Sequence, residues 1–335
     1  MQKSPQSALA SHLIKEIRHR LPENMELAKN LEPLLEVGRS ALYKRLRGAL
    51  AFTPDELVVL ARHFQISMDK FVLDQPGIVA LEFPVLTEPV HSSVAFLSRV
   101  EQQLQVALNL PEPTLFYASA EIPLFCYFRY PELTAFKLYM WSRTTWLLPE
   151  FEHQKFSFSN FPNKAEILKR SEAILRHYCD LPSCEFWTLH MLENTLNQID
   201  FLAYEGGFAE PEMAKLLHEQ LGSLISWQQQ MAERGCKIDN TNREGAKLLV
   251  YHNEIAHTNN TLLVQSATHR QAFFTFDNPN FGTSSSPVFC NYTADWFNRL
   301  QRCSIRMSRE GEKQRFRFFE KLQHRLFLKS KEPFF

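Results

Sequence analysis

The chain has 335 residues, of which 44% are hydrophobic and 22% are charged, and its 37 Lys and Arg balance its 37 Asp and Glu. This length suits two or three domains, and the composition is that of a folded protein rather than a disordered one. The N-terminus lacks the apolar core of a signal peptide, and no run approaches the roughly 18 apolar residues of a membrane span. Six scattered cysteines show no disulfide framework, so we expect a cytoplasmic protein with reduced thiols and no membrane contact.

The zero net charge hides a segregation along the chain. Residues 1–73 hold 11 Lys and Arg against 8 Asp and Glu, and residues 299–335 hold 11 against 4. Residues 74–298 hold 15 against 25. Two interpretations of the basic C-terminal end stay open: it contacts DNA beside a body that repels DNA, or it packs on that acidic body.

The N-terminal part is predicted to be helical. Apolar residues recur at helical spacing in residues 7–20 and again in residues 25–35, where Pro33 weakens the end of the second helix. Glu36, Val37 and Gly38 form a short break with one buried aliphatic side chain. A further helix begins after Thr53, because a Thr cap, a Pro at the first position and a Glu three residues after the cap are typical of a helix start.

Residues 35–48, LEVGRSALYKRLRG, organise this part of the chain. Between positions 39 and 47 there are four basic residues and no acidic one. Leu42 and Leu46 are four residues apart, so they share a packing face. The opposite face is predicted to meet phosphates and base edges. It carries Arg39, Ser40, Tyr43, Lys44 and Arg47.

Residues 25–73 resemble the Cro/C1-type (lambda-repressor-like) helix-turn-helix, and most of all its BetR-type variant, in LLEVGRSALYKRLRG and TPDELVVLARHFQISMDKFV. The resemblance implies a compact bundle of four or five helices with a DNA-reading helix at residues 39–46. The family often has Gly where Glu36 stands and a Ser cap where Gly38 stands. Gly38 can still cap the helix at a small loss, whereas Glu36 is expected to repel phosphate and lower the affinity for DNA. The other interpretation is a solvated basic helix in a generic bundle.

The rest of the chain is predicted to be a second, larger domain at residues 91–335, after a linker at residues 74–90 that Pro and Gly interrupt. Residues 78–83 and 115–117 suit short strands. Residues 122–141 are expected to form a buried helix with a break at Pro131, or else a partner-binding face. Further helices are expected at residues 91–110, 164–178, 182–204, 211–234, 293–304 and 310–328.

Four short segments after residue 245 are interpreted as strands parted by Asn-containing turns at residues 259–260 and 278–280, and they predict a small antiparallel sheet. These segments are residues 246–252, 261–265, 271–276 and 287–290. The predicted fold class is therefore mainly α, with an N-terminal lambda-repressor-like bundle at residues 1–73 and a larger α+β domain. The larger domain also resembles the C-terminal part of full-length regulators that share the N-terminal module, in the segments EIPLFCYFRYPELTAFKLYMWS and NEIAHTNNTLLV. This resemblance supports the domain organisation but implies no ligand and no activity.

Three patterns were considered as sites of chemistry. His177, Cys179, Cys184 and His190 match no common zinc-finger spacing, so buried or surface side chains are expected there. His252, Glu254 and His257 lack the H-E-x-x-H spacing that places two histidines on one helix face. Residues 282–286, GTSSS, have no P-loop Lys and no following helix start, which favours a sheet loop. We therefore predict no enzyme activity, no cofactor and no metal site.

The sequence predicts a sequence-specific DNA-binding transcriptional regulator that reads the major groove of double-stranded DNA with helix 39–47. Base and phosphate contacts are expected from Arg39, Ser40, Tyr43, Lys44 and Arg47, with Arg45 on phosphate. One module buries little surface, so a homodimer on two half-sites is expected, with the C-terminal part serving dimerisation or the sensing of an unidentified effector. The alternatives are a protein-interaction module, or an enzyme domain that the N-terminal bundle targets.

Overall fold

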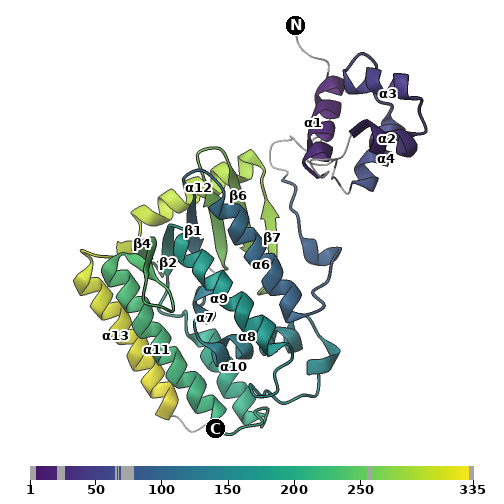
Figure 1. The fold of residues 1–335 in the computed structure, drawn as a ribbon. Helices are drawn as coiled ribbons and strands as arrows, with labels where there is room; N and C mark the ends of the chain where they lie inside the picture. Colours follow the sequence, from purple (N-terminus) through teal and green to yellow (C-terminus); the bar gives the residue numbers. More distant parts are fainter. Residues whose placement is uncertain are drawn as a thin grey trace. The chain divides into compact units, whose positions relative to one another are not determined.

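A computed structural model of the chain describes residues 5–20, 27–64, 66, 68, 79–254 and 259–331. The chain divides into two compact units, Met1–Ala80 and Leu81–Phe335 (Figure 1). The end of the predicted helix-turn-helix module, the first five residues of the predicted linker (74–78) and His257 lie outside the described residues. Among the residues that are described, no helix is both long enough and apolar enough to cross a membrane.

The described part of the N-terminal unit consists of helices around one small core. The helices are α1 (Pro5–Arg20), α2 (Leu27–Leu35), α3 (Arg39–Leu46) and α4 (Pro54–His63). Helix α2 contacts both α3 and α4. Leu13, Ile17, Leu31, Leu42 and Leu60 are fully buried and meet in the core. The helix predicted after Thr53 is confirmed, with Pro54 in its first turn and a capping box between Thr53 and Glu56.

The C-terminal unit is built on a mixed sheet of eight strands in its described part, in the order β3-β4-β2-β1-β5-β6-β7, with β8 paired to β4. Strands β1, β2 and β4 run parallel, and the remaining pairs are antiparallel. The strands are β1 (Thr114–Ala118), β2 (Ser183–Trp187), β3 (Cys236–Ile238), β4 (Glu244–His252), β5 (Thr261–Gln265), β6 (Arg270–Thr275), β7 (Phe281–Ser284) and β8 (Ile305–Arg306).

Helices cover both faces of this sheet (Figure 1). On one face, α6 (Ser93–Leu108) packs beside α9 (Lys164–Asp180), and α11 (Met213–Arg234) packs beside α13 (Glu312–Lys331). On the other face, α12 (Pro287–Arg302) lies against β5 and β6. The remaining elements are α7 (Leu124–Tyr127), α8 (Pro131–Thr144), α10 (Glu193–Tyr204) and the 3-10 turns η1 (Pro84–Leu86) and η2 (Pro149–Phe151).

The alternation of side chains along β1 shows how the sheet separates two cores. Leu115 and Tyr117 face the large core under α6 and α9, whereas Phe116 and Ala118 face the smaller core under α12. The predicted buried helix at residues 122–141 is confirmed as core, because α7 and most of α8 are buried within this unit. Helix α11 ends at Arg234, as predicted, with Gly235 in the left-handed conformation that glycine allows.

The predicted fold class is wrong, because the sheet is neither small nor antiparallel. Its parallel centre depends on β2, which lies inside the helix predicted at residues 182–204; the helix there, α10, begins only at Glu193. All five residues of β2 are buried. A short strand buried on both faces has no hydrophobic alternation, so periodicity alone does not distinguish it from a buried helix.

Three smaller differences concern strands. Residues 287–290 are not a strand but the first turn of α12, where Pro287 stands at a position that helices accept. Strands β3, β7 and β8 were not predicted either. The strand predicted at residues 78–83 contributes a single bridge, between Glu82 and Thr283. By contrast, the strand predicted at residues 261–265 coincides with β5.

Candidate nucleic-acid interface

Helix α3 is held in place by its apolar face. Leu42 is fully buried, and Val37 and Leu46 are half-buried against the same core. The predicted packing face of this helix is therefore confirmed. Because Leu42 and Leu46 are one turn apart, they fix which side of α3 turns away from the bundle.

The turn before α3 has an unusual backbone at Glu36. This residue has a φ of 51°, in the left-handed region that glycine occupies at least cost, and it is exposed. Gly38 is the residue before the helix, with φ −62° and ψ 146°, and no side chain caps the first turn there. The turn thus has a charged, strained residue at Glu36 and a helix start at Gly38 without a side-chain cap. These are the two positions at which the sequence departs from the family pattern.

The outward face of α3 carries Ser40, Tyr43, Lys44 and Arg47, which are spaced so that they share one side of a helix. Ser40, Lys44 and Arg47 are exposed and Tyr43 is half-buried. The guanidinium of Arg47 lies 6.0 Å from the centre of the Tyr43 ring. Arg39 is exposed in the first turn. Within the part of the chain that the structure describes, Arg39, Lys44 and Arg47 have no ion pair.

Arg45 has a different environment from the other basic residues of α3. Its Nε donates to Oε2 of Glu56 at 2.8 Å, and its Nη2 lies 2.8 Å from Oε1 of the same carboxylate. The exposed fractions of the two side chains are 11% and 12%. Glu56 also accepts from the backbone N–H of Thr53. Arg45 therefore ties α3 to the start of α4, a pairing that the sequence analysis did not identify.

The four residues considered for zinc do not form one cluster. Cys179 belongs to the large core of the sheet and Cys184 to the smaller core on the other face, while His190 is exposed. No group of three or more His, Cys, Asp and Glu able to hold a metal ion is found among the described residues. The expectation of a sheet loop without a following helix is wrong for the GTSSS segment. Gly282, Thr283 and Ser284 belong to β7, where Gly282 pairs with Phe274, and α12 begins directly after the segment at Pro287.

His252 and Glu254 do come together, near the carboxyl ends of β2 and β4. His252 Nε2 lies 2.7 Å from Glu254 Oε1, which also accepts from the backbone N–H of Leu189 at 2.6 Å. His190 Nε2 is 3.8 Å from the second oxygen of Glu254. The carboxylate is thus engaged by two imidazoles and a backbone amide. His257, the third residue of the pattern that the sequence analysis disfavoured as a site, lies outside the described residues.

Part of the basic C-terminal end is neutralised within its own unit. Arg325 of α13 lies 3.1 Å from Glu193, and Lys329 lies 3.6 Å from Asp200, with both carboxylates on α10. The apolar side of α13 packs against α11, with Phe318, Phe319 and Leu322 buried. For these residues the structure agrees with the second of the two interpretations, in which the basic end packs on the acidic body.

Comparison of the chain with known protein families, with curated proteins and with solved structures gives no match. Any function assigned to α3 must therefore be argued from its own geometry and charge.

Proposed function

We propose that the protein is a DNA-binding transcriptional regulator whose N-terminal unit is a helix-turn-helix module, with α3 entering the major groove of double-stranded DNA. The proposal is carried by one observation: α3 presents Ser40, Lys44 and Arg47 on an exposed face while Leu42 fixes its opposite face in the core. A helix whose apolar face is buried in the bundle and whose exposed basic side chains have no ion pair can enter the major groove and contact the phosphates on either side of it.

Different side chains have different roles in this proposal. Lys44 contacts phosphate as a compact charge, and Arg39 or Arg47 pairs through both guanidinium nitrogens with a guanine. Ser40 and Tyr43 supply hydroxyl groups to phosphates or base edges. Arg45 has a positioning role instead of the phosphate contact expected from the sequence, since Glu56 already binds its guanidinium.

A single module of this size buries too little surface for useful specificity, so the proposal includes a homodimer. Its two α3 helices would meet half-sites about 34 Å apart, one turn of DNA. The C-terminal unit would provide the dimer contact and the response to an effector. Its acidic central segment disfavours contact with DNA, which leaves the N-terminal unit as the DNA-binding part.

The decisive experiment selects bound sequences from random duplexes with the full-length chain and then measures affinity over a range of salt concentrations. We compare the wild type with Arg39→Ala plus Lys44→Ala. The matched control is Lys15→Ala plus Arg62→Ala, which removes the same charge from exposed positions on α1 and α4. A consensus is expected for the wild type and the control. The test variant should lose about 10- to 100-fold in affinity, and its salt slope should fall by about 1 for each lost phosphate contact.

Two results would overturn the proposal. If the control variant loses as much affinity as the test variant, net charge alone accounts for binding and α3 is not the reading element. If the wild type binds no duplex at low salt, the N-terminal unit does not bind DNA, and a protein-interaction module replaces the regulator as the better hypothesis.

A further inference from the structure

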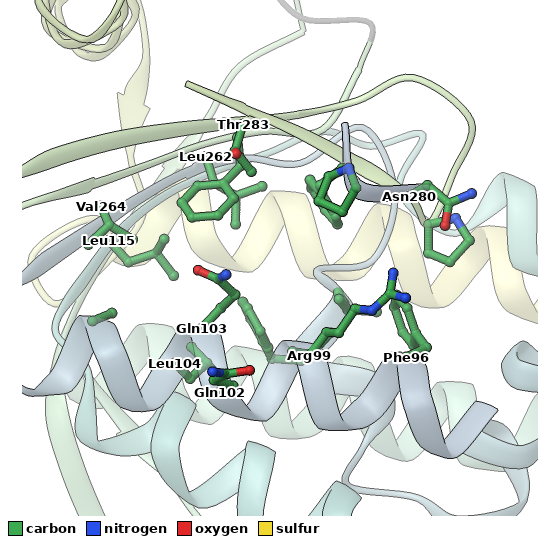
Figure 2. Close-up of a pocket in the computed structure, with 18 of the residues that line it drawn as sticks. Phe96, Arg99, Gln102, Gln103, Leu104, Leu115, Leu262, Val264, Asn280 and Thr283 are labelled. Carbon is green, nitrogen blue, oxygen red and sulfur yellow. The ribbon is translucent and has the colours of Figure 1, made fainter. Parts of the chain in front are cut away.

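The C-terminal unit contains a cavity that the proposed DNA contact does not use. It lies between α6 and the strands β1, β5, β6 and β7, and its volume is about 210 Å³. Figure 2 shows Phe96, Arg99 and Gln103 on α6 facing the strand residues Leu115, Leu262 and Thr283 across it. Most of the side chains that line the cavity are aliphatic or aromatic.

Two of the polar groups in the lining, those of Tyr117 and Asn280, already have partners within the protein. The hydroxyl of Tyr117 accepts a hydrogen bond from the backbone N–H of Leu124 at 3.2 Å. The amide of Asn280 accepts from Trp146 Nε1 at 3.1 Å and donates to Asp277 at 2.9 Å. Because the lining is mostly apolar and these polar groups have partners, the interior favours an apolar body.

The mouth of the cavity, in contrast, is polar and carries a positive charge. Arg99 is the one charged residue in the lining, and its side chain is 35% exposed. One of its terminal nitrogens donates to the backbone carbonyl of Glu88 at 2.9 Å, which anchors the guanidinium at the rim. The same nitrogen lies 3.8 Å from Oε2 of Glu88, an ion pair in which the Glu88 side chain is 74% exposed. Nε and Nη1 of Arg99 make no hydrogen bond with the described residues, and Gln102 and Gln103 stand exposed one turn further along α6. A guanidinium with free donors beside an apolar cavity is suited to a carboxylate or similar anion.

We propose that this cavity binds a small amphipathic molecule, with its apolar body between α6 and the sheet and its anionic head on Arg99. Alkyl and aryl-alkyl carboxylates have this chemistry. The inference stands apart from the proposed DNA contact, because every residue that lines the cavity belongs to the C-terminal unit.

The occupant would also touch the segment with which this unit begins. Glu82 and Thr283 exchange two backbone hydrogen bonds of 2.8 Å, which add residue 82 to the edge of β7. Pro84, Val85 and Val90, a few residues later, form part of the cavity wall. A bound molecule therefore links this entry segment to α6 and the sheet. Occupancy would stabilise the unit and reduce hydrogen exchange at the backbone amides of residues 82 and 283.

The test uses isothermal titration of the full-length protein with decanoate, below the concentration at which decanoate forms micelles, and with 1-decanol as a neutral ligand of the same chain length. Saturable binding of one molecule is expected, with a preference of about ten-fold for decanoate. Arg99→Gln should remove the preference and keep the binding of decanol. Arg176→Gln is the matched control, because Arg176 is an exposed α9 residue paired with Glu172 that does not line the cavity.

A second pair of variants fills the cavity. Val100→Phe and Ala107→Leu both add side-chain volume from α6, and each should abolish the binding of both ligands. Thermal denaturation confirms that each variant is folded, and two positions are used so that one unfolded variant does not decide the outcome. The proposal is overturned if the wild type shows no saturable binding, or if a folded cavity-filling variant binds decanoate as the wild type does. An unchanged preference in Arg99→Gln would overturn the assignment of the anionic head. None of these results depends on DNA binding.

Discussion

Arg45 and Glu56 face each other through two contacts of 2.8 Å, one from each of two guanidinium nitrogens to a separate carboxylate oxygen. This geometry is the strongest form of the pair, and both side chains are nearly buried. Arg45→Met should therefore lower the free energy of unfolding of the N-terminal unit by about 1–3 kcal/mol, since it leaves Glu56 without its partner. Thermal denaturation of the full-length chain measures the change.

A double-mutant cycle with Arg45→Met, Glu56→Gln and the double variant measures the interaction free energy between these two side chains. A coupling energy of at least about 1 kcal/mol is expected. At a temperature where all variants are folded, Arg45→Met should bind DNA more tightly than Lys44→Ala does. The reverse order would mean that Arg45 contacts phosphate after all, and that the pair with Glu56 opens in the complex.

Glu36 leads to a second prediction, because its positive φ and its negative charge can be separated by substitution. Glu36→Gly should raise the free energy of unfolding by about 0.5–1 kcal/mol, since glycine adopts this conformation without strain. It should also strengthen DNA binding, because a carboxylate beside the reading helix repels phosphate. Glu36→Ala removes the charge and keeps the strain, so it should strengthen DNA binding without the gain in stability. Equal stability of the two variants would contradict the assignment of strain to this position.

Gly38 gives a third prediction about the start of α3. No atom lies within 4 Å of the position that a Cβ would occupy there, so a side chain fits without displacement. Gly38→Ser adds a hydroxyl that can cap the first turn, and stability should rise by about 0.5–1 kcal/mol. Gly38→Ala reduces the entropy of the unfolded chain but adds no cap, and alanine is a poorer N-cap than glycine, so no gain in stability is expected. The difference between the two melting temperatures measures the cap alone, and a zero difference would show that the hydroxyl finds no backbone partner.

The comparison of sequence and structure shows which signals carry information about this fold. The capping box of Thr53 and Glu56 and the four-residue spacing of Leu42 and Leu46 are local, and both predicted their helices correctly. The pair between Arg45 and Glu56 joins residues eleven positions apart on different helices, so no local pattern indicated it. The same limit applies to the cavity, whose lining combines residues from α6 with residues more than 150 positions later.

Strand β2 is the element that was wrongly predicted to be part of a helix. Its hydrophobic residues fit the helical spacing of the segment that follows, but its polar residues follow a period of two. Ser183 and Trp187 both donate to the buried carboxylate of Glu185, at 2.7 and 3.0 Å, because alternate residues of a strand point the same way. In the sequence, however, the apolar residues Cys184, Phe186 and Trp187 do not alternate, so the spacing of Ser183 and Glu185 alone could not separate this strand from the helix that follows.

Lys237 provides the last prediction, which concerns pH. This β3 side chain is fully buried, and its ammonium donates to the backbone carbonyls of Tyr178 and Leu181 at 2.9 and 2.6 Å. Burial lowers the pKa of Lys237 from 10.5 to about 8, even though the nearby Glu185 acts in the opposite direction. Between these two values the unfolded chain holds a proton that the folded chain releases, so this group makes stability rise with pH in that window.

Lys237→Met removes this titration and keeps a side chain of similar length. The wild type should gain about 2 kcal/mol of stability relative to this variant between pH 7 and pH 9.5, whatever the offset at pH 7. Using the difference cancels the groups that titrate in both proteins and do not interact with Lys237, among them Cys184, whose pKa burial raises to about 12. Lys247→Met, at an exposed position on β4, is the control and should run parallel to the wild type. If the curve of Lys237→Met is also parallel, the ammonium keeps its ordinary affinity for the proton, and its two carbonyl partners offset the cost of burial completely.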